Sequence, residues 1–595
     1  MRGSAPAAPV SFPPRLIVGL LVGGLALVVG CRSGSPSVAE LAGAVVSAEA
    51  ESARNAALDP GLAVVELDAY RGPGVVGGDT GPARYVRGLS RGFRTAEAMA
   101  TLERLDRTYR SAGSPEFDGA LDDIEEALRR GGFDGTDPRF ELRWLVGAEL
   151  AQGWQPVRAQ LELHGASGTR VLHAFDAPHQ PERVLLPIHA PSARVRGPVV
   201  LALEDVDEGS VFVTEAPARQ VADRARAAGA VAVVSASLGD YNVDPHGTER
   251  HLDAIQYRKL LPGNTVPVAQ VSQRTFAAIK AALAEGPVEL ALDAEVEVYE
   301  RPLRTLVAIV HGGKHPGRAV VVCAHVNEPG ANDNGSGVAT LLEGALVVRE
   351  AIAANRFARP GTSLLFVFGD EFRQSEMVLE QGGFDVIAGI SADMTGQSLE
   401  RTGAIALLER GPDPGALVCL PPDEHSTWGQ GEVEEGMLFA NGLAVIARCA
   451  MVDVGLFEER ESARPWPSAD HPWEGGSDHD VYLKAGVPAV LFWHFTDFTY
   501  HTSLDRPDMV DPEEMRRTGA AIFSTALAVA NAGPTDLSRY VESLRVEIDV
   551  RVAAAEAHGD PQLATRWREW GSGARSWLRK LCLDLEVDEA APLLR

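Results

Sequence analysis

Buried strands and amphipathic helices alternate through the second half of the chain, judged from its hydrophobic pattern. Apolar runs of the kind that form buried strands occur at residues 305–312, 318–325, 362–369, 386–392 and 488–495. Apolar residues at helical spacing predict helices at 339–353 and 513–532. Strands that alternate with helices predict an α/β fold with a mixed, mostly parallel sheet flanked by helices.

The first half of the chain shows two further patterns. Helical periodicity predicts helices at 96–110 and 120–133, and Gly131 and Gly132 close the second one. Residues 195–283 contain short strand-like runs that alternate with helical stretches, which predicts a second, smaller α/β unit. Residues 71–88 are rich in glycine and lack a sustained period, so they are expected to form a loop or linker.

The N-terminus has the pattern of a targeting segment. Arg2 and Arg15 precede an apolar run at 16–30 that ends at Cys31, and this run is short for a membrane span. The ending VVGC resembles a bacterial lipobox, which implies that Cys31 becomes the lipidated first residue of an exported protein anchored to a membrane of the cell envelope, on its periplasmic or extracellular face. A plain signal peptide, or an anchor helix with an incidental cysteine, remains the alternative.

Composition narrows the possible partners. The chain has 595 residues and a formal net charge of -27, and an acidic surface repels phosphate backbones, so nucleic acid is not expected to bind. Four cysteines follow Cys31. They are too few for a disulfide framework in a chain of this length, and they form no CxxC metal pattern.

Polar side chains follow the ends of the predicted strands. In open α/β sheets, ligands bind at the carboxyl ends of the strands. The side chains found at these ends and in the loops after them are His325, Asp333, Asp370, Glu371, Asp393 and His501. Each has an ordinary explanation as a turn or capping residue, whereas one metal site explains them together, because nitrogen and oxygen ligands of these types suit zinc.

The order of these motifs carries a family resemblance. His325, GANDNGSG at 330–337, the acidic pair at 370–371, DMTG at 393–396 and YHTSLD at 500–505 resemble the co-catalytic dizinc aminopeptidases, a family that also includes glutamate carboxypeptidase II and the transferrin receptor. Further similar segments lie at 108–133 and 475–490. Residues 196–272 look like the protease-associated domain that some members insert ahead of their metal ligands.

The resemblance implies a cofactor of two zinc ions per chain, with cobalt or manganese as other possible metals. His325 and Asp393 are expected to hold one ion, Glu371 and His501 the other, and Asp333 both. A water shared by the two ions is expected to attack the peptide carbonyl.

The resemblance also implies catalytic and supporting roles. Asp370 occupies the position of the general base and Tyr500 that of a phenol that stabilises the oxyanion, while Asn327 and Asp478 are expected to support the ligands. Two positions depart from the family pattern. Asp370 replaces a glutamate and is one methylene shorter, and Asn327 replaces an aspartate, so it keeps an acceptor oxygen but lacks the charge.

The expected function is an exported zinc metallopeptidase acting on peptides, most simply an aminopeptidase. Two alternatives stay open, namely a peptidase-fold binding protein with weak or no catalysis, and a glutaminyl cyclase-like acyl transfer with one zinc. The expected organisation is a signal peptide at 1–31, a linker at 32–95, the first part of the peptidase domain at 96–190, a protease-associated domain at 191–290, the catalytic domain at 291–535 and a helical extension at 536–595.

Overall fold

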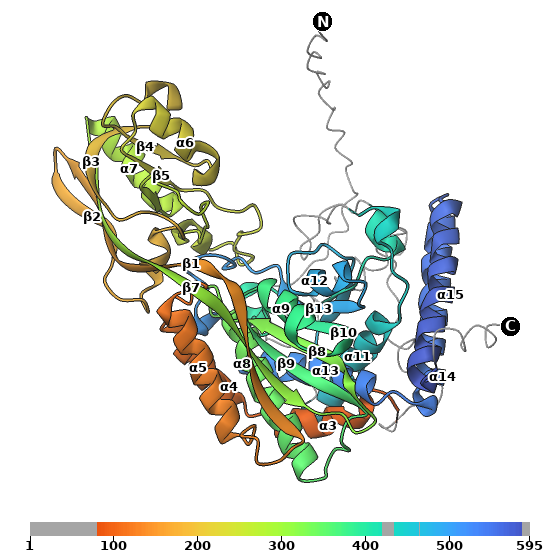
Figure 1. Cartoon of the computed structure of the whole chain (residues 1–595). Coiled ribbons are helices and arrows are strands. Elements are labelled where there is room, and N and C mark those ends of the chain that lie inside the picture. Colours follow the sequence, from red (N-terminus) through yellow and green to blue (C-terminus); the bar gives the residue numbers. More distant parts are fainter. Residues whose placement is uncertain (1–79, 419–432, 463–464, 586–595) are drawn as a thin grey trace, which may run out of the picture. The chain divides into compact units, whose positions relative to one another are not determined.

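Two long antiparallel strands, β1 (Phe140–Gly165) and β7 (Glu289–Val310), run through the centre of the computed structural model (Figure 1). The structure describes residues 80–418, 433–462 and 465–585. The expected signal peptide, the lipidated Cys31 and most of the expected linker lie outside the described residues.

One end of the β1–β7 ribbon belongs to a mixed sheet that continues through β9, β8, β10, β13, β11 and β12. Its centre is parallel, with β8 next to β9 and β10, and β10 next to β13, whereas β7 and β11 run antiparallel to their neighbours β9 and β13. The central strands are β8 (His315–His325), β9 (Thr362–Gly369), β10 (Asp385–Ala392) and β13 (Ala489–Phe495), and the edge strands are β11 (Ile405–Glu409) and β12 (Ser468–His471). The predicted mixed, mostly parallel sheet is thereby confirmed.

Helices cover both faces of this sheet. Every residue of β9 is buried, as the continuous apolar run predicts for a strand covered on both sides. The larger helical layer is formed by α4 (Thr95–Asp106), α5 (Pro115–Arg130), α8 (Gly335–Ala353), α11 (Leu443–Ser462) and α13 (Pro512–Ala530). The opposite face packs against α9 (Arg373–Gln381) and α12 (His479–Lys484).

The other end of the β1–β7 ribbon belongs to a second hydrophobic core. Its apolar side chains come mainly from residues 154–294. Parallel strands β3 to β6 extend the sheet from β7, and β2 pairs with β1. The elements are β2 (Gly168–Phe175), β3 (Ala193–Val200), β4 (Val211–Thr214), α6 (Ala218–Ala228), β5 (Ala232–Ser235), β6 (Val268–Gln270) and α7 (Gln273–Glu285). The second core therefore includes β2 and part of β1, which precede the boundary at 191 expected from sequence.

The expected linker up to residue 95 needs one correction. The structure contains a helix, α3 (Ala83–Gly92), within it. Tyr85, Val86 and Leu89 lie on one face of this helix and are buried in the main core. The flanking glycines and arginines conceal this short apolar stripe in the sequence.

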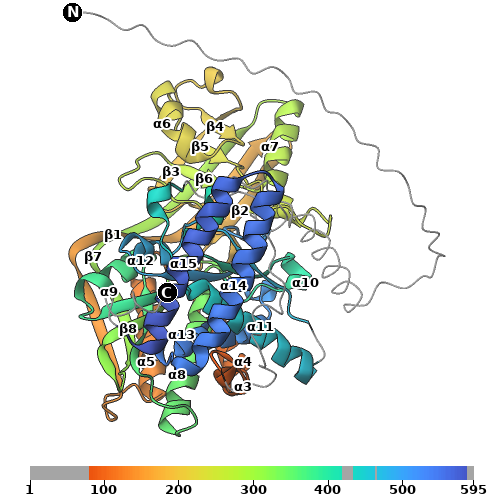
Figure 2. The same ribbon diagram turned by 90° about the vertical axis from the view of Figure 1, so that its right-hand side faces the viewer.

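A pair of C-terminal helices, α14 (Pro534–Ala557) and α15 (Pro561–Leu583), pack along each other, as the views in Figures 1 and 2 show, and agree with the predicted helical extension. A charged network joins α14 to the edge of the sheet. Asp470 of β12 lies 3.1 Å from an Arg410 nitrogen and 2.9 Å from an Arg551 nitrogen, and Arg551 pairs with Glu547 at 3.1 Å. Within the part of the chain that the structure describes, no helix combines the length and apolar character needed to cross a membrane.

This network makes stability depend on pH. Burial alone raises the pKa of Asp470, but Arg551, Arg410 and Arg448 outweigh it and lower the pKa from 3.8 to about 2. A carboxyl whose pKa is lower in the folded state stabilises the fold above its unfolded pKa and loses that contribution as the pH falls toward the folded value.

We therefore expect Asp470→Asn to lower the free energy of unfolding by about 3 kcal/mol near neutral pH, because it removes one of the buried carboxylates that neutralise Arg410 and Arg551. The difference in the free energy of unfolding between the variant and the unmodified protein should become about 1 kcal/mol smaller as the pH falls from 6 to 3. Urea unfolding across this range measures it, with Asp549→Asn in an exposed pair as the control. A difference that stays constant with pH would contradict the assignment.

Candidate metal centre

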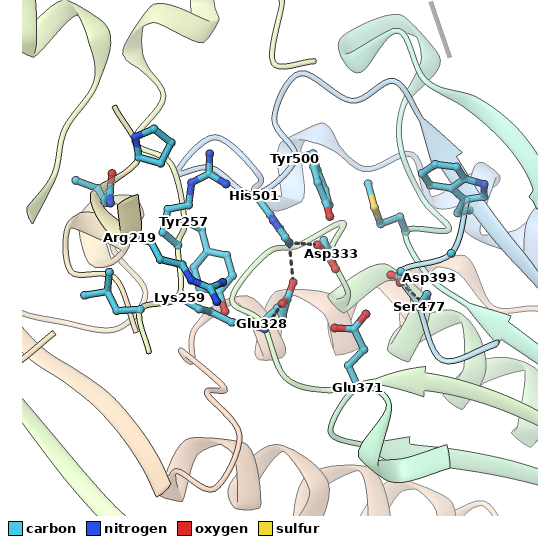
Figure 3. Close-up of a pocket in the computed structure, with 18 of the residues that line it drawn as sticks. Arg219, Tyr257, Lys259, Glu328, Asp333, Glu371, Asp393, Ser477, Tyr500 and His501 are labelled. Atoms are coloured by element: carbon cyan, nitrogen blue, oxygen red, sulfur yellow. Dashed lines mark hydrogen bonds and ion pairs between the residues drawn. The ribbon is translucent and has the colours of Figure 1, made fainter. Parts of the chain in front are cut away.

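The carboxyl ends of four neighbouring strands place polar side chains at or next to one cavity. His325 ends β8, Glu371 follows β9, Asp393 follows β10 and His501 follows β13. The cavity has a volume of about 540 Å³, and its wall includes Asp333, Glu371, Asp393, Tyr500 and His501 (Figure 3). Neither His325 nor Asp370 is on this wall. The sheet therefore assembles most of the predicted site residues at the edge where the fold class places ligands.

A first group of possible metal ligands consists of His325, Glu371 and Asp393, whose ligand atoms all lie within 4.8 Å of one another. His325 Nε2 is 3.2 Å from Asp393 Oδ2. His325 Nδ1 lies 3.2 Å from the backbone oxygen of Asn327, an arrangement in which Nδ1 carries the proton and Nε2 faces the carboxylates.

A second group consists of Glu328, Asp333 and His501 and meets the same distance limit. His501 Nε2 lies 2.9 Å from Asp333 Oδ2 and 2.9 Å from Glu328 Oε2, as the dashed lines in Figure 3 show. The other oxygen of Asp333 is 3.6 Å from His325 Nε2. Asp333 thus contacts a histidine of each group, which is the position expected of a ligand shared by two ions. Glu328 was not predicted from sequence.

The loop that carries Asp333 is fixed by its backbone. Asp505 accepts hydrogen bonds from the N–H groups of Asn332 and Asp333, at 2.7 and 3.0 Å. Asn334 caps α8 by accepting from the N–H of Gly337 at 3.0 Å, and its amide donates to the carbonyl of Ala392 at the end of β10. The loop is therefore held from both sides by hydrogen bonds to other parts of the chain.

Two buried arginines support the start of the same loop. Arg110 donates to the carbonyl oxygens of Val326 and Gly330 at 2.9 and 3.0 Å, and Arg183 donates to that of Pro329 at 2.6 Å. Desolvation lowers the pKa of each guanidinium to about 10. Sequence analysis missed both, because an arginine 146 or more residues away carries no local signal of this contact.

Asp478, which is expected from the sequence to support the ligands, lies against the turn after β9. It accepts hydrogen bonds from the N–H of Phe372 at 3.0 Å, the Gln374 amide at 2.6 Å and the Ser375 hydroxyl at 2.8 Å. Phe372 has a positive φ of 62°, so the turn bends sharply at the point where these contacts hold it.

Asn327 supports the ligands differently from the sequence expectation. Its side-chain oxygen accepts the backbone N–H of Glu371 at 2.8 Å, and its backbone oxygen is the atom that faces His325. The uncharged side chain of Asn327 therefore positions the loop of Glu371. The backbone carbonyl of Asn327 orients the ring of His325.

Burial changes the proton affinity of the acidic groups. Desolvation raises the pKa of Asp333 to about 7, with Glu328 adding to the rise. Desolvation also raises the pKa of Asp370 to about 7, with Asp478 adding to the rise and Lys259 and His325 opposing it. A carboxyl with a pKa near neutrality can exchange a proton at physiological pH, as a general base must.

Tyr500 lies against the second group. Its ring stacks on His501 with centroids 4.0 Å apart and planes at 15°, and its hydroxyl end lies toward Asp333 in Figure 3. Burial raises the pKa of this phenol, and the charge of Asp333 raises it further. Tyr500 is therefore a neutral hydrogen-bond donor on the wall of the cavity.

The second core supplies the opposite wall of the cavity. Arg219, Tyr257 and Lys259 face the acidic groups in Figure 3. Lys259 Nζ lies 2.6 Å from Glu328 Oε1. This ion pair connects the two cores directly at the candidate metal centre, and it was not predicted from sequence.

The residues present fit zinc ions. His325 Nε2 and Asp393 Oδ1 are buried and have no hydrogen-bond partner among the described residues, although a buried polar atom is ordinarily paired. Several carboxylates share a poorly hydrated site, which is costly unless cations neutralise them. Imidazole and carboxylate ligands are the types that zinc binds in catalytic sites.

Comparison with known proteins finds a matching family and similar structures. Residues 305–371 match peptidase family M28. Over 488 residues the chain is 25% identical to the probable lipoprotein aminopeptidase LpqL of Mycobacterium tuberculosis, covering 74% of this chain and 86% of that protein. A peptidase M28 precursor from Shewanella amazonensis has a similar structure, with a TM-score of 0.50 and 17% identity over 76% of this chain and 96% of that one. The zinc aminopeptidase BSAP of Bacillus subtilis gives a TM-score of 0.45 and 16% identity, over 73% and 94%.

The chain therefore contains a peptidase M28 domain. The resemblance to this family, inferred from the motifs between His325 and His501, is confirmed. The Shewanella structure confirms the fold class, whereas the protease-associated domain stays a prediction.

The support that Asp505 gives to Asp333 leads to a prediction. Asp505→Asn keeps one acceptor oxygen but turns an amide NH2 toward a backbone N–H, so the loop should lose its fixed position. We expect zinc affinity to fall about 10–100-fold, the usual effect of losing a group that positions a ligand. Competition with a chromophoric chelator measures this, and Asp508→Asn, an exposed neighbour, is the control. Unchanged affinity in Asp505→Asn would show that the loop needs no such support.

Proposed function

We propose that this protein is a zinc-dependent aminopeptidase that binds two zinc ions and is exported and lipid-anchored through Cys31. The observation that carries the proposal is the pair of adjacent histidine–carboxylate groups joined by Asp333 at the carboxyl edge of the sheet. The family match and the aminopeptidase name of the mycobacterial relative support the reaction class.

The ligand assignment follows the two groups. His325, Glu371 and Asp393 would hold one ion, Asp333 and His501 the other, and Asp333 reaches toward both. Zinc in such a pair of sites supplies a Lewis acid for the peptide carbonyl and activates the attacking water. The proximity of Glu371 to His325 and Asp393, with ligand atoms within 4.8 Å of one another, supports this grouping, whereas the family resemblance implied the ion of His501.

The chain's own residues would move and hold the protons. Asp370, whose pKa burial raises to about 7, would accept the proton of the attacking water and pass it to the leaving amine. The Tyr500 hydroxyl would donate a hydrogen bond to the oxygen that gains negative charge. Asp478 fixes the turn on which Asp370 lies, and this matters because a shorter carboxylate tolerates little displacement.

The cavity also favours a substrate side chain of apolar character. Met394, Leu491 and Trp493 line it next to Asp393. A peptide whose first side chain fills this part would place its first peptide bond near the two groups. We therefore propose residues with apolar side chains as the preferred N-terminal residues.

Export and anchoring rest on the N-terminal sequence and on the relative. Arg2, Arg15, the apolar run and Cys31 form a lipobox-like segment, and the mycobacterial protein is named a lipoprotein. Both support a lipid-anchored protein at the cell envelope.

The function is tested on full-length protein in detergent. Bound zinc is measured by elemental analysis, and hydrolysis of aminoacyl p-nitroanilides is followed in the same sample. Two zinc ions per chain with fastest release from leucine and methionine derivatives are expected. Two ions without hydrolysis of any peptide would favour a binding protein, one ion with cyclisation of N-terminal glutamine would favour a cyclase, and no zinc after reconstitution would reject the centre.

Asp370 provides the sharpest catalytic prediction. Asp370→Asn should lower kcat about 10²–10⁴-fold, the range for loss of a general base, while two zinc ions stay bound because the proposed ligands are intact. Asp370→Glu, which keeps a carboxylate, should retain measurable turnover. Equal loss of activity in both variants with zinc content unchanged would assign the proton transfer to another group.

A further inference from the structure

We infer that Glu328 is an additional ligand of the metal ion held by Asp333 and His501, and that Lys259 is the counter-ion of this ligand. The inference rests on the proposed zinc centre and extends its ligand set. Neither the strand-end pattern nor the family resemblance assigned Glu328 any part in the site.

Distances place Glu328 among the ligands. Its Oε2 lies 2.9 Å from His501 Nε2, the same distance that separates this nitrogen from Asp333 Oδ2. The ligand atoms of all three residues lie within 4.8 Å of one another. Two carboxylates therefore converge on one imidazole nitrogen of His501.

The backbone directs Glu328 into the cavity. Its φ is 83°, a left-handed conformation that a glutamate rarely adopts. Arg110 and Arg183 hold the carbonyl oxygens of Val326 and Pro329 on either side of it. The side chain is 5% exposed, so it is turned inward rather than toward solvent.

The two carboxylate oxygens of Glu328 have different partners. Oε1 accepts from Lys259 Nζ at 2.6 Å, and Oε2 faces His501. One oxygen can therefore bind a metal while the other remains paired with a cation. Lys259 offsets the charge that the additional ligand brings into the site.

Counting ligands strengthens this assignment. Catalytic zinc sites commonly provide three protein ligands and leave one position open. The first group offers a histidine and two carboxylates, namely His325, Glu371 and Asp393. With Glu328 the second group offers the same set, whereas Asp333 and His501 alone supply two ligands.

A purely structural role for Glu328 would use the same contacts, but it predicts a different effect of substitutions on zinc affinity. Glu328 could serve only to fasten Lys259, and with it the second core, to the metal loop. In that role, removal of either partner weakens the fold equally and leaves zinc affinity unchanged. As a ligand, Glu328 affects zinc binding, and removal of Lys259 does not weaken it.

The test is zinc titration of the full-length, chelator-treated protein in detergent, with a chromophoric competitor that resolves the affinity of each ion. Glu328→Gln should weaken one of the two ions at least 10-fold and change the other less than 3-fold. Lys259→Met should bind both ions as tightly as the unmodified protein, or more tightly, because Oε1 is released. Unchanged affinity in Glu328→Gln, or equal weakening in both variants, would overturn the inference.

Control variants distinguish loss of the ligand from a folding defect and from failure of the proposed zinc centre as a whole. Glu343→Gln removes a buried glutamate that pairs with Arg94 at 2.6 Å outside the centre, and it should leave zinc affinity unchanged. Glu328→Asp retains the charge and should recover part of the lost affinity if a carboxylate is what binds. Failure of the unmodified protein to bind zinc would reject the whole centre. Normal zinc binding by the unmodified protein, with the same affinity in Glu328→Gln, would reject only the additional ligand.

Discussion

Concentrated negative charge at the carboxyl edge of the sheet is the constraint on which the rest of the structure depends. Glu328, Asp333, Glu371 and Asp393 converge there with little access to water. Burial penalises the charged forms of Asp333 and Glu371 and raises the pKa of both carboxyls. Such a cluster is stabilised by cations inside it, and Lys259 and the proposed zinc ions are the groups that supply them.

The two hydrophobic cores adjoin each other at this group of acidic residues. The β1–β7 ribbon belongs to both of them, so the second core cannot move far from the sheet without breaking its own strands. Arg183 and Lys259 come from segments of the second core and contact the loop at Pro329 and Glu328. The second core therefore contributes cations to the metal loop as well as one wall of the cavity.

The sequence predicted what local patterns can encode. The runs that became β8, β9, β10 and β13 were visible because strands buried on both faces are continuously apolar, and the ligand types at their ends suggested the metal site. The long β1 was not predicted, because its exposure varies along the strand without a simple period. Arg110, Arg183 and Lys259 were missed for another reason. Their roles depend on contacts with residues far away in the chain, and an isolated cation in sequence is far more often a surface residue.

Asn327 and Glu328 show how a departure from the family pattern at one residue can be compensated by its neighbour in the sequence. The resemblance places an aspartate at position 327, and here its side chain is an uncharged amide that holds the backbone of Glu371. The next residue carries the missing charge, and its positive φ turns it toward His501. The main chain at Asn327 orients His325 without a carboxylate. The centre thus keeps its number of acidic groups while moving one of them from the first histidine to the second, where Lys259 offsets its charge.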